Sequence, residues 1–217
     1  MISAGASGPV WALLPVKSFA RAKSRLSAVL SGAERAALAR RLCAHILSTL
    51  GRCAAVDGIL VLSDSQDVLR MVQEQGAHGE PQLDSLPSER TLGAIVDDGI
   101  QRLQRRGAQA ALIVMSDLPL ASAEDFSQQL QLLRDHDWVI APDLREQNTN
   151  ALALRLGGTA GASIHTAFGS GDSFRLHVER AEQLGQRLAI HRAPGLGFDV
   201  DIPADYAELL TKGPWGL

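Results

Sequence analysis

The sequence predicts an α/β domain in three layers, built on a mainly parallel β-sheet. Apolar, strand-like runs alternate with helical patterns along the whole chain, which is typical of this class. The run A-A-L-I-V-M at residues 110–115 is continuously apolar, as a central parallel strand buried on both faces should be. No internal repeat, low-complexity tract or interdomain linker interrupts the 217 residues. We therefore expect residues 1–217 to form a single domain.

The first half of the chain supplies the early strands and helices. Residues 9–16 (P-V-W-A-L-L-P-V) predict a first buried strand. Ser31 and Glu34 form an S-x-x-E capping box, which begins a helix that runs to about Leu50. A strand at 58–63 and a short helix at 66–75 follow. Residues 77–87 are polar and predict irregular chain, and a long helix begins near Ser88 with its apolar residues on one face.

The second half continues the alternation. After the strand at 110–115, Ser122 caps a helix to about Asp135. Strands are predicted at 138–141, 151–156 and 187–191, and helices at 174–184 and from Pro203 to about Leu210. Residues 157–171 are rich in Gly, Ser, Thr and Ala and predict a loop. Ligands bind such sheets at the carboxyl ends of the strands, so the loops after residues 16, 63, 115, 141 and 191 are the candidate site.

Composition and charge exclude several classes of function. The chain is 46% hydrophobic and 21% charged with a net charge of −3, so no global basic field favours a nucleic-acid partner. The N-terminus lacks a basic segment and its apolar run covers only residues 10–16, which predicts neither a signal peptide nor a membrane span. We expect a cytoplasmic protein without a membrane partner. Cys43 and Cys53 show no metal-binding spacing and are expected to be reduced thiols.

The loop after the first strand carries four basic residues within nine positions and no acid: Lys17, Arg21, Lys23 and Arg25. Cationic side chains and free backbone N–H groups at a strand-to-helix loop suit a polyphosphate. A solvated basic loop is the alternative. The chain has neither G-x-x-x-x-G-K-[ST] nor G-x-G-x-x-G in this loop, so P-loop and dinucleotide-binding sites are not supported.

Three aspartates are candidates for metal binding. Asp117 follows the central strand directly, and Asp199 and Asp201 lie in G-F-D-V-D-I, which predicts a strand. Residues two apart on a strand share a face, and like charges so placed repel unless a cation joins them. Oxygen ligands without His or Cys suit Mg²⁺ or Mn²⁺. Helix-entry or capping acids are the alternative interpretation.

The polar side chains of two further segments can either bind a ligand or stabilise a local turn or helix cap. Asp143 ends one predicted strand, and Thr149 and Asn150 begin the next. Short polar side chains there bind a ligand or make a turn. The stretch F-G-S-G-D-S-F-R-L-H at 168–177 is a Gly/Ser loop that enters a helix, and its free N–H groups suit either an anion or an ordinary cap at Ser170, Asp172 or Ser173.

Five segments taken together resemble the 2-phospho-L-lactate guanylyltransferase family, which acts in biosynthesis of the deazaflavin coenzyme factor 420. They occur in the expected order from residue 13 to residue 205. These segments are L-L-P-V-K-S-F-A-R-A-K-S-R-L, S-D-L-P-L, A-P-D followed by T-N-A-L, G-D-S-F-R-L-H, and G-F-D-V-D-I-P-A-D.

The resemblance implies a nucleotidyltransferase-like fold of the nucleotide-diphospho-sugar transferase type with a mainly parallel mixed sheet. It implies that GTP is joined to the phosphate of 2-phospho-L-lactate, phosphoenolpyruvate or 3-phospho-D-glycerate, with release of pyrophosphate and with Mg²⁺ as the cofactor. The residues that it implies are Asp117, Asp199 and Asp201 for the metal, Lys17, Lys23 and Arg25 with Asp117 for the GTP phosphates and catalysis, and Thr149, Gly169, Gly171 and Ser173 for the acid.

Two positions depart from the family pattern. Glu146, Gln147 and Asn148 stand where the family has glycine before T-N, and Gly93 stands where it often has Asn in G-L-N-A-A-L. The first departure concerns the acid, and the second concerns contacts with the base. The six histidines are expected to be structural, with His177, one turn after Ser173, as the candidate exception.

Three alternatives stay open. The fold could serve a molybdopterin or sugar-phosphate nucleotidyltransferase or a metal-dependent glycosyltransferase, although the Gly-rich loop with which the pterin and sugar enzymes open is missing from residues 13–26. A non-catalytic nucleotide-binding domain is the alternative from another class of function.

The oligomeric state has no signal in the sequence, and we expect a homodimer only because homodimers are the most frequent assemblies.

Overall fold

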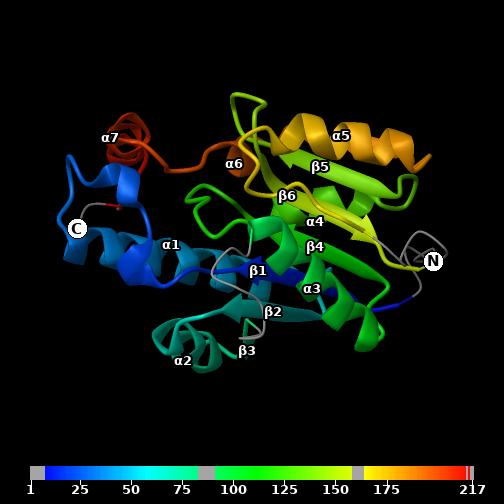
Figure 1. Cartoon of the computed structure of the whole chain (residues 1–217), viewed down its shortest axis with the longest axis horizontal. Coiled ribbons are helices and arrows are strands. Elements are labelled where there is room, and N and C mark those ends of the chain that lie inside the picture. Colours follow the sequence, from blue (N-terminus) through cyan, green and yellow to red (C-terminus); the bar gives the residue numbers. More distant parts are fainter. Residues whose placement is uncertain (1–7, 83–90, 158–163, 214, 216–217) are drawn as a thin grey trace.

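The centre of the molecule is a mixed β-sheet. The structure, a computed structural model, describes residues 8–82, 91–157, 164–213 and 215. These residues form one seven-stranded sheet in the order β3-β2-β1-β4-β6-β5-β7 (Figure 1). The strands are β1 (Val10–Pro15), β2 (Gly58–Ser63), β3 (His78–Pro81), β4 (Ala110–Val114), β5 (Trp138–Pro142), β6 (Thr149–Arg155) and β7 (Leu188–Ile190).

Strand β6 runs against its neighbours, whereas the other described pairs are parallel. β6 pairs antiparallel with both β4 and β5, and Val114 at the end of β4 lies opposite Ala151 near the start of β6. The beginning of β6 therefore lies at the same edge of the sheet as the carboxyl ends of β1 and β4. This arrangement confirms the predicted mainly parallel mixed sheet.

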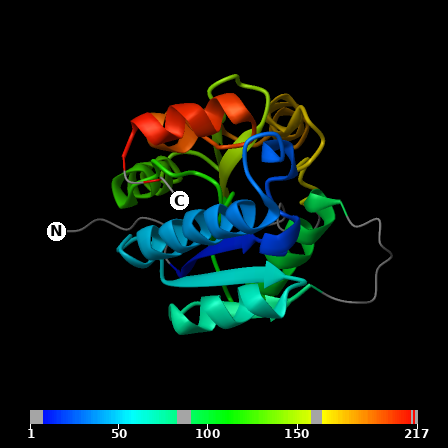
Figure 2. The same cartoon turned by 90° about the vertical axis from the view of Figure 1, so that its left-hand side faces the viewer.

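Helices cover both faces of the sheet, as Figures 1 and 2 show. One buried core joins the sheet to α1 (Gly32–Gly51), α2 (Gln66–Glu74) and α4 (Ala123–Leu132). A second core joins the opposite face to α3 (Leu92–Arg105) and α5 (Ser173–Gln183). The three predicted layers are thus present. None of the described helices is long and apolar enough to cross a membrane.

A third, smaller core lies beyond the end of the sheet and joins segments that are far apart in the sequence. In Figure 1 this end holds the short helices η1 (Phe19–Arg21) and η2 (Ser24–Leu26) beside α7 (Pro203–Thr211). Apolar side chains from the loop after β1, from α1, from the segment before α7 and from α7 itself pack there. They are Leu26, Leu30, Leu38, Leu42, Phe198, Val200 and Leu209.

Most predicted elements occur within a few residues of their expected bounds. The capping box of Ser31 and Glu34 is present, and Ser122 caps α4 by accepting a hydrogen bond from the Asp125 N–H at 3.1 Å. The expected helix start near Ser88 lies outside the described residues; in the described part, α3 begins at Leu92. The prediction of irregular chain at 77–87 was wrong at its start, where β3 pairs with β2.

The predicted strand at residues 197–202 was also wrong. Residues Pro194–Gly197 form the short helix α6, and residues 198–202 join none of the described strands. Phe198 and Val200 are nevertheless buried in the third core, while Asp199 and Asp201 between them are partly exposed. The alternation of apolar and acidic residues therefore reflects packing of one side of an extended segment, without a neighbouring strand.

Gly195 allows this segment to approach α4 closely, which gives a first testable prediction. A Cβ atom there would lie 2.5 Å from Asp125 Oδ2 and 2.6 Å from the Leu120 carbonyl oxygen. Because a backbone oxygen cannot move away freely, Gly195→Ala should lower the free energy of unfolding by about 1–3 kcal/mol in urea titrations.

The matched control is Gly51→Ala at the end of α1, where a Cβ would meet nothing within 4 Å. This change should be neutral or should stabilise the protein by about 0.4–1 kcal/mol, because it only restricts the unfolded chain. Equal unfolding midpoints for Gly195→Ala and the wild type would contradict the close approach.

Candidate active site

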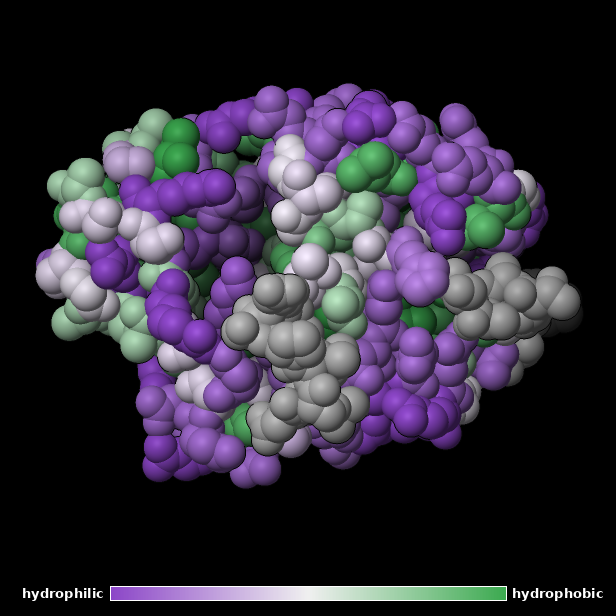
Figure 3. Space-filling view, in the orientation of Figure 1, coloured by the Kyte–Doolittle hydropathy of each residue, from purple (hydrophilic) through white to green (hydrophobic). Residues whose placement is uncertain are grey.

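All ten residues predicted for the site line a single cavity of about 630 Å³. The cavity lies where β1 and β4 end and β6 begins, between the third core and the start of α5. Figure 3 shows this face of the molecule, which is hollowed left of its centre and carries hydrophilic residues around the hollow. The ten residues are Lys17, Lys23, Arg25, Asp117, Thr149, Gly169, Gly171, Ser173, Asp199 and Asp201.

Lys23 connects two of the predicted metal ligands. Its Nζ lies 2.6 Å from Asp117 Oδ2 and 3.1 Å from Asp201 Oδ1, and its side chain is only 7% exposed. Burial lowers the pKa of Lys23, but the charges of the two carboxylates outweigh it and raise this pKa above its ordinary value. Arg25 adds a longer contact, 3.5 Å, to Asp201.

The backbone of Lys23 is itself unusual. Its φ of 53° and ψ of 37° lie in the left-handed region, which non-glycine residues adopt rarely and at a cost in free energy. The conformation directs the ammonium group into the cavity, where the ion pairs to Asp117 and Asp201 compensate for it. The sequence gives no sign of this strain.

Asp199 lies in the same cavity without a cationic partner. It makes no ion pair with any described residue, while Asp117 and Asp201 are both bound to Lys23. Burial, followed by the charges of Asp117 and Asp201, raises the pKa of Asp199 to about 7. This end of the cavity therefore carries negative charge that the neighbouring lysine neutralises only in part.

A buried polar cluster lies at the other end of the cavity. The Thr149 N–H donates to Ser173 Oγ at 2.9 Å, and Thr149 Oγ1 lies 2.9 Å from His177 Nδ1. His177 Nε2 accepts from the Ala167 N–H at 2.9 Å. The His177 ring is fully buried, and this burial lowers its pKa to about 4, so it is neutral at pH 7. His177, the candidate exception among the histidines, lies behind the cavity wall and contacts Thr149, which lines it.

The loop before α5 is shaped by glycines. Gly169 and Gly171, with φ of 83° and 80°, adopt left-handed conformations that favour glycine. At the start of α3, a Cβ on Gly93 would lie 2.8 Å from the Thr166 carbonyl oxygen. The loop therefore leaves no room for the asparagine that the family often has at this position. Asp97 holds Thr166 in this position against Gly93, because its carboxylate accepts hydrogen bonds from the Thr166 N–H and hydroxyl, each at 2.8 Å.

The turn between β5 and β6 shows which polar residues are structural. The buried carboxylate of Asp143 accepts from the Gln147 N–H at 2.8 Å and from Asn148 Nδ2 at 3.0 Å. Asn150 donates to the Leu196 carbonyl at 2.9 Å and so ties α6 to the sheet. Asp143 therefore closes the turn, and the Asn150 amide has a structural partner.

Several residues that the site prediction omitted also line the cavity. Arg21 and Ser24 belong to the basic loop, and Gln82 follows β3. Gln147 and Asn148 line it as well, at the positions where the resembling family has glycine. The basic run in the sequence had already indicated Arg21 for a polyphosphate, although the ten predicted site residues left it out, whereas Gln82 was hidden because β3 has almost no apolar residues.

The donor chemistry of the cavity fits a hard divalent cation. Three carboxylates face it, and Asp199 has the raised pKa expected of an acid that lacks a compensating charge. Within the described ranges, no group of three or more His, Cys, Asp or Glu side chains is arranged to hold a metal ion. Lys23 occupies oxygens of Asp117 and Asp201 instead, so a cation there must compete with its ammonium group.

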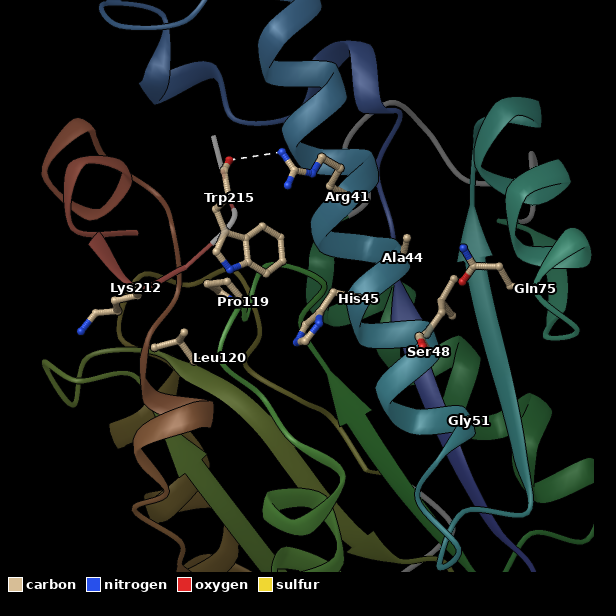
Figure 4. A pocket seen from close by; sticks show the side chains of 11 residues that line it. Arg41, Ala44, His45, Ser48, Gly51, Gln75, Pro119, Leu120, Lys212 and Trp215 are labelled. Carbon is tan, nitrogen blue, oxygen red and sulfur yellow. Dashed lines mark hydrogen bonds between the residues drawn. The ribbon is translucent and has the colours of Figure 1, made fainter. Parts of the chain in front are cut away.

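A second, wider cavity lies along α1 and extends to Gln75 at the end of α2 (Figure 4). It has a volume of about 1020 Å³, and its walls include Arg41, His45, Pro119 and Trp215. Arg41 donates to the Trp215 carbonyl oxygen at 3.3 Å, and the Trp215 ring meets His45 edge-on. None of the predicted site residues lines this cavity, and its lining includes no acidic residue among those that the structure describes. The larger of the two cavities is therefore not the candidate active site.

The sequence is similar to proteins of one family over nearly its whole length. The model of the family described as "Guanylyl transferase CofC like" matches residues 10–215. A phosphoenolpyruvate guanylyltransferase of Sphaerobacter thermophilus is 35% identical, with 94% of each chain covered. A 3-phospho-D-glycerate guanylyltransferase of Phenylobacterium zucineum is 32% identical over 94% of this chain and 91% of its own. A 2-phospho-L-lactate guanylyltransferase of Methanothermobacter thermautotrophicus is 29% identical, covering 93% and 84%.

Solved structures are similar in fold. A protein from Desulfovibrio desulfuricans G20 described as a nucleotide-diphospho-sugar transferase has a TM-score of 0.73 at 19% identity, covering 92% of this chain and 85% of that one. A 4-diphosphocytidyl-2C-methyl-D-erythritol synthase from Anaerococcus prevotii has a TM-score of 0.64 at 12% identity, covering 95% and 97%. The predicted fold type is thereby confirmed.

The neutral His177 ring makes stability depend on pH. In the native protein it stays unprotonated down to about pH 4, whereas the unfolded chain takes up this proton below 6.5. Since the unfolded state binds more protons in this window, the free energy of unfolding should fall as the pH drops from 6.5 to 4. The contribution of this group is about 3 kcal/mol. Urea titrations of the wild type and His177→Gln across the window measure it, and equal slopes would contradict a buried neutral ring.

Proposed function

The chain belongs to the family of CofC-like guanylyl transferases, and on that premise we propose that it joins GTP to the phosphate of a three-carbon phospho-acid and releases pyrophosphate. The acid is 2-phospho-L-lactate, phosphoenolpyruvate or 3-phospho-D-glycerate, the three substrates in the names of its relatives. The reaction serves biosynthesis of the deazaflavin coenzyme factor 420. The observation that carries the proposal is the single cavity with carboxylates and cations at one end and buried hydroxyl groups at the other.

The cationic end suits the triphosphate of GTP. Lys17, Lys23 and Arg25 line the cavity where β1 ends, and Lys17 makes no ion pair with any described residue. Cationic side chains neutralise the charge that develops on a departing pyrophosphate. We assign the β- and γ-phosphates to this loop.

The hydroxyl end suits the acid. Thr149 and Ser173 are each only 2% exposed, yet both line the cavity. Gly169 and Gly171, whose left-handed backbone favours glycine, place no side chain in the same region. Hydroxyl groups there can donate to the carboxylate that all three candidate acids share.

Asp117, Asp199 and Asp201 would hold Mg²⁺. A bound Mg²⁺ ion would neutralise charge on the α-phosphate and on the attacking phosphate, which repel each other. In the structure Lys23 contacts two of these carboxylates, and it would release them to stabilise the triphosphate. The raised pKa of Asp199, about 7, supports a cation at this position.

The chemical step needs no general base. An oxygen of the acid's phosphate, already ionised at neutral pH, attacks the α-phosphorus of GTP. The new P–O bond forms as the bond from the α-phosphorus to the bridging oxygen of pyrophosphate breaks, and pyrophosphate leaves with the electron pair. No histidine or cysteine among the described residues lines the cavity, which agrees with catalysis by positioning and charge.

The predicted metal ligands are tested by substitution. Asp117→Asn and Asp199→Asn should each lower kcat by about 10²-fold or more, as removal of one electrostatic stabiliser does. The matched control is Asp67→Asn on α2, because Asp67 pairs with Arg70 alone among the described residues and lies outside the cavity. It should keep wild-type turnover. Wild-type turnover in both site variants would refute the metal assignment.

The activity itself is tested by pyrophosphate release with the three acids against GTP, ATP and CTP. We expect turnover with GTP and at least one acid, loss of turnover with EDTA, and recovery with Mg²⁺. Absence of turnover with every pair would refute the proposal, and unchanged turnover in EDTA would refute only the metal requirement. We also propose that the protein acts in the cytoplasm and that it forms a homodimer. Sedimentation velocity tests the homodimer.

A further inference from the structure

The hydroxyl end of the cavity is held by His177, a residue that does not line the cavity itself. Its ring is fully buried and its edge faces the ring of Phe168, with 4.8 Å between the ring centres. Phe168 does line the cavity. His177 is thus separated from any ligand by the residues that it contacts.

The two hydrogen bonds of His177 fix its tautomer. Ala167 N can only donate, because a backbone amide nitrogen carries a proton and no free lone pair. His177 Nε2, 2.9 Å away, must therefore be the unprotonated nitrogen. The neutral ring then carries its proton on Nδ1, which lies 2.9 Å from Thr149 Oγ1.

This tautomer determines the direction of the Thr149 hydroxyl. Since Nδ1–H donates to Thr149 Oγ1, the hydroxyl accepts from the histidine and must donate its own proton elsewhere. Ser173 is oriented in the same sense, because its Oγ accepts from the Thr149 N–H. In the described part of the chain, neither hydroxyl donates to a protein acceptor, although both side chains are 98% buried.

We propose that His177 is a positioning residue, which makes the Thr149 hydroxyl a hydrogen-bond donor to the acid substrate. The hydroxyl groups of Thr149 and Ser173 then form a pair of buried donors, which select a ligand atom that accepts hydrogen bonds. A carboxylate oxygen meets this requirement, whereas an amide N–H or an ammonium group at the same point, which has no acceptor, does not. The identity of the acid rests on the proposed function. The direction of the hydrogen bonds is independent of the proposed function.

The direction of the bonds is tested first in the wild-type protein without substrates. Two-bond ¹H–¹⁵N correlation spectra of the imidazoles distinguish protonated from unprotonated ring nitrogens, and the signal missing from His177→Gln identifies His177. We expect Nδ1 protonated and Nε2 unprotonated at pH 7. A proton on Nε2, or a charged ring, would overturn the proposal even if the enzyme is active.

The consequence for substrate binding is tested with two matched pairs of variants. His177→Gln can accept from Ala167 N–H but loses the donor at Nδ1, whereas His177→Asn can place an amide N–H near Nδ1. Thr149→Val removes the hydroxyl and Thr149→Ser keeps it. His177→Gln and Thr149→Val should raise KM for the acid about 10-fold, the effect of one hydrogen bond to a charged group. KM for GTP and kcat should stay within about twofold, and His177→Asn and Thr149→Ser should be closer to the wild type.

A double-mutant cycle separates positioning from general stability. If His177 acts through Thr149, the variant with both Thr149→Val and His177→Gln should bind the acid no worse than Thr149→Val alone. Additive losses, about 100-fold together, or equal increases in KM for GTP, would overturn the proposal. Lack of pyrophosphate release by the wild type with every acid would instead refute the proposed function, and the spectra would still decide the direction of the hydrogen bonds.

Discussion

The contact of one buried lysine with two aspartates joins three segments at one end of the candidate site. Lys23 comes from the loop after β1, Asp117 from the loop after β4, and Asp201 from the segment before α7. Burying an ammonium group is costly unless charges of opposite sign surround it, so these three segments must meet for any of them to be stable. Leu26, three residues after Lys23, and Val200, beside Asp201, both belong to the third core, which buries apolar side chains of the same segments.

The direction of β6 brings the opposite end of the cavity to this charged contact. In a fully parallel sheet the start of a strand lies far from the ends of its neighbours. β6 is antiparallel to β4, so Thr149 at its start lies beside the end of β4. Ser173, at the start of α5, then reaches the Thr149 N–H. The basic loop after β1 and the start of β6 therefore line one cavity of about 630 Å³.

The two ends of the cavity differ in charge and in burial. At the charged end, cations and carboxylates lie close together and are partly exposed, with Arg25 73% and Asp201 42% exposed. At the hydroxyl end, neutral donors are buried and held by hydrogen bonds, and His177 stays uncharged there because its burial lowers its pKa to about 4. The first end suits a multiply charged triphosphate and metal, and the second suits discrimination among small acids.

The sequence alone determined the layered α/β fold, most element bounds and ten of the residues that line the cavity, because apolar periodicity, caps and ordered motifs are local properties. It did not reveal β3, whose polar residues pair at the edge of the sheet. It also suggested a strand for Asp199 and Asp201, since packing against the third core produces the same alternation as a sheet. Only the tertiary structure decided that Lys23 binds Asp117, that Gly93 lies against Thr166, and that His177 contacts Thr149, because each contact joins residues remote in the chain.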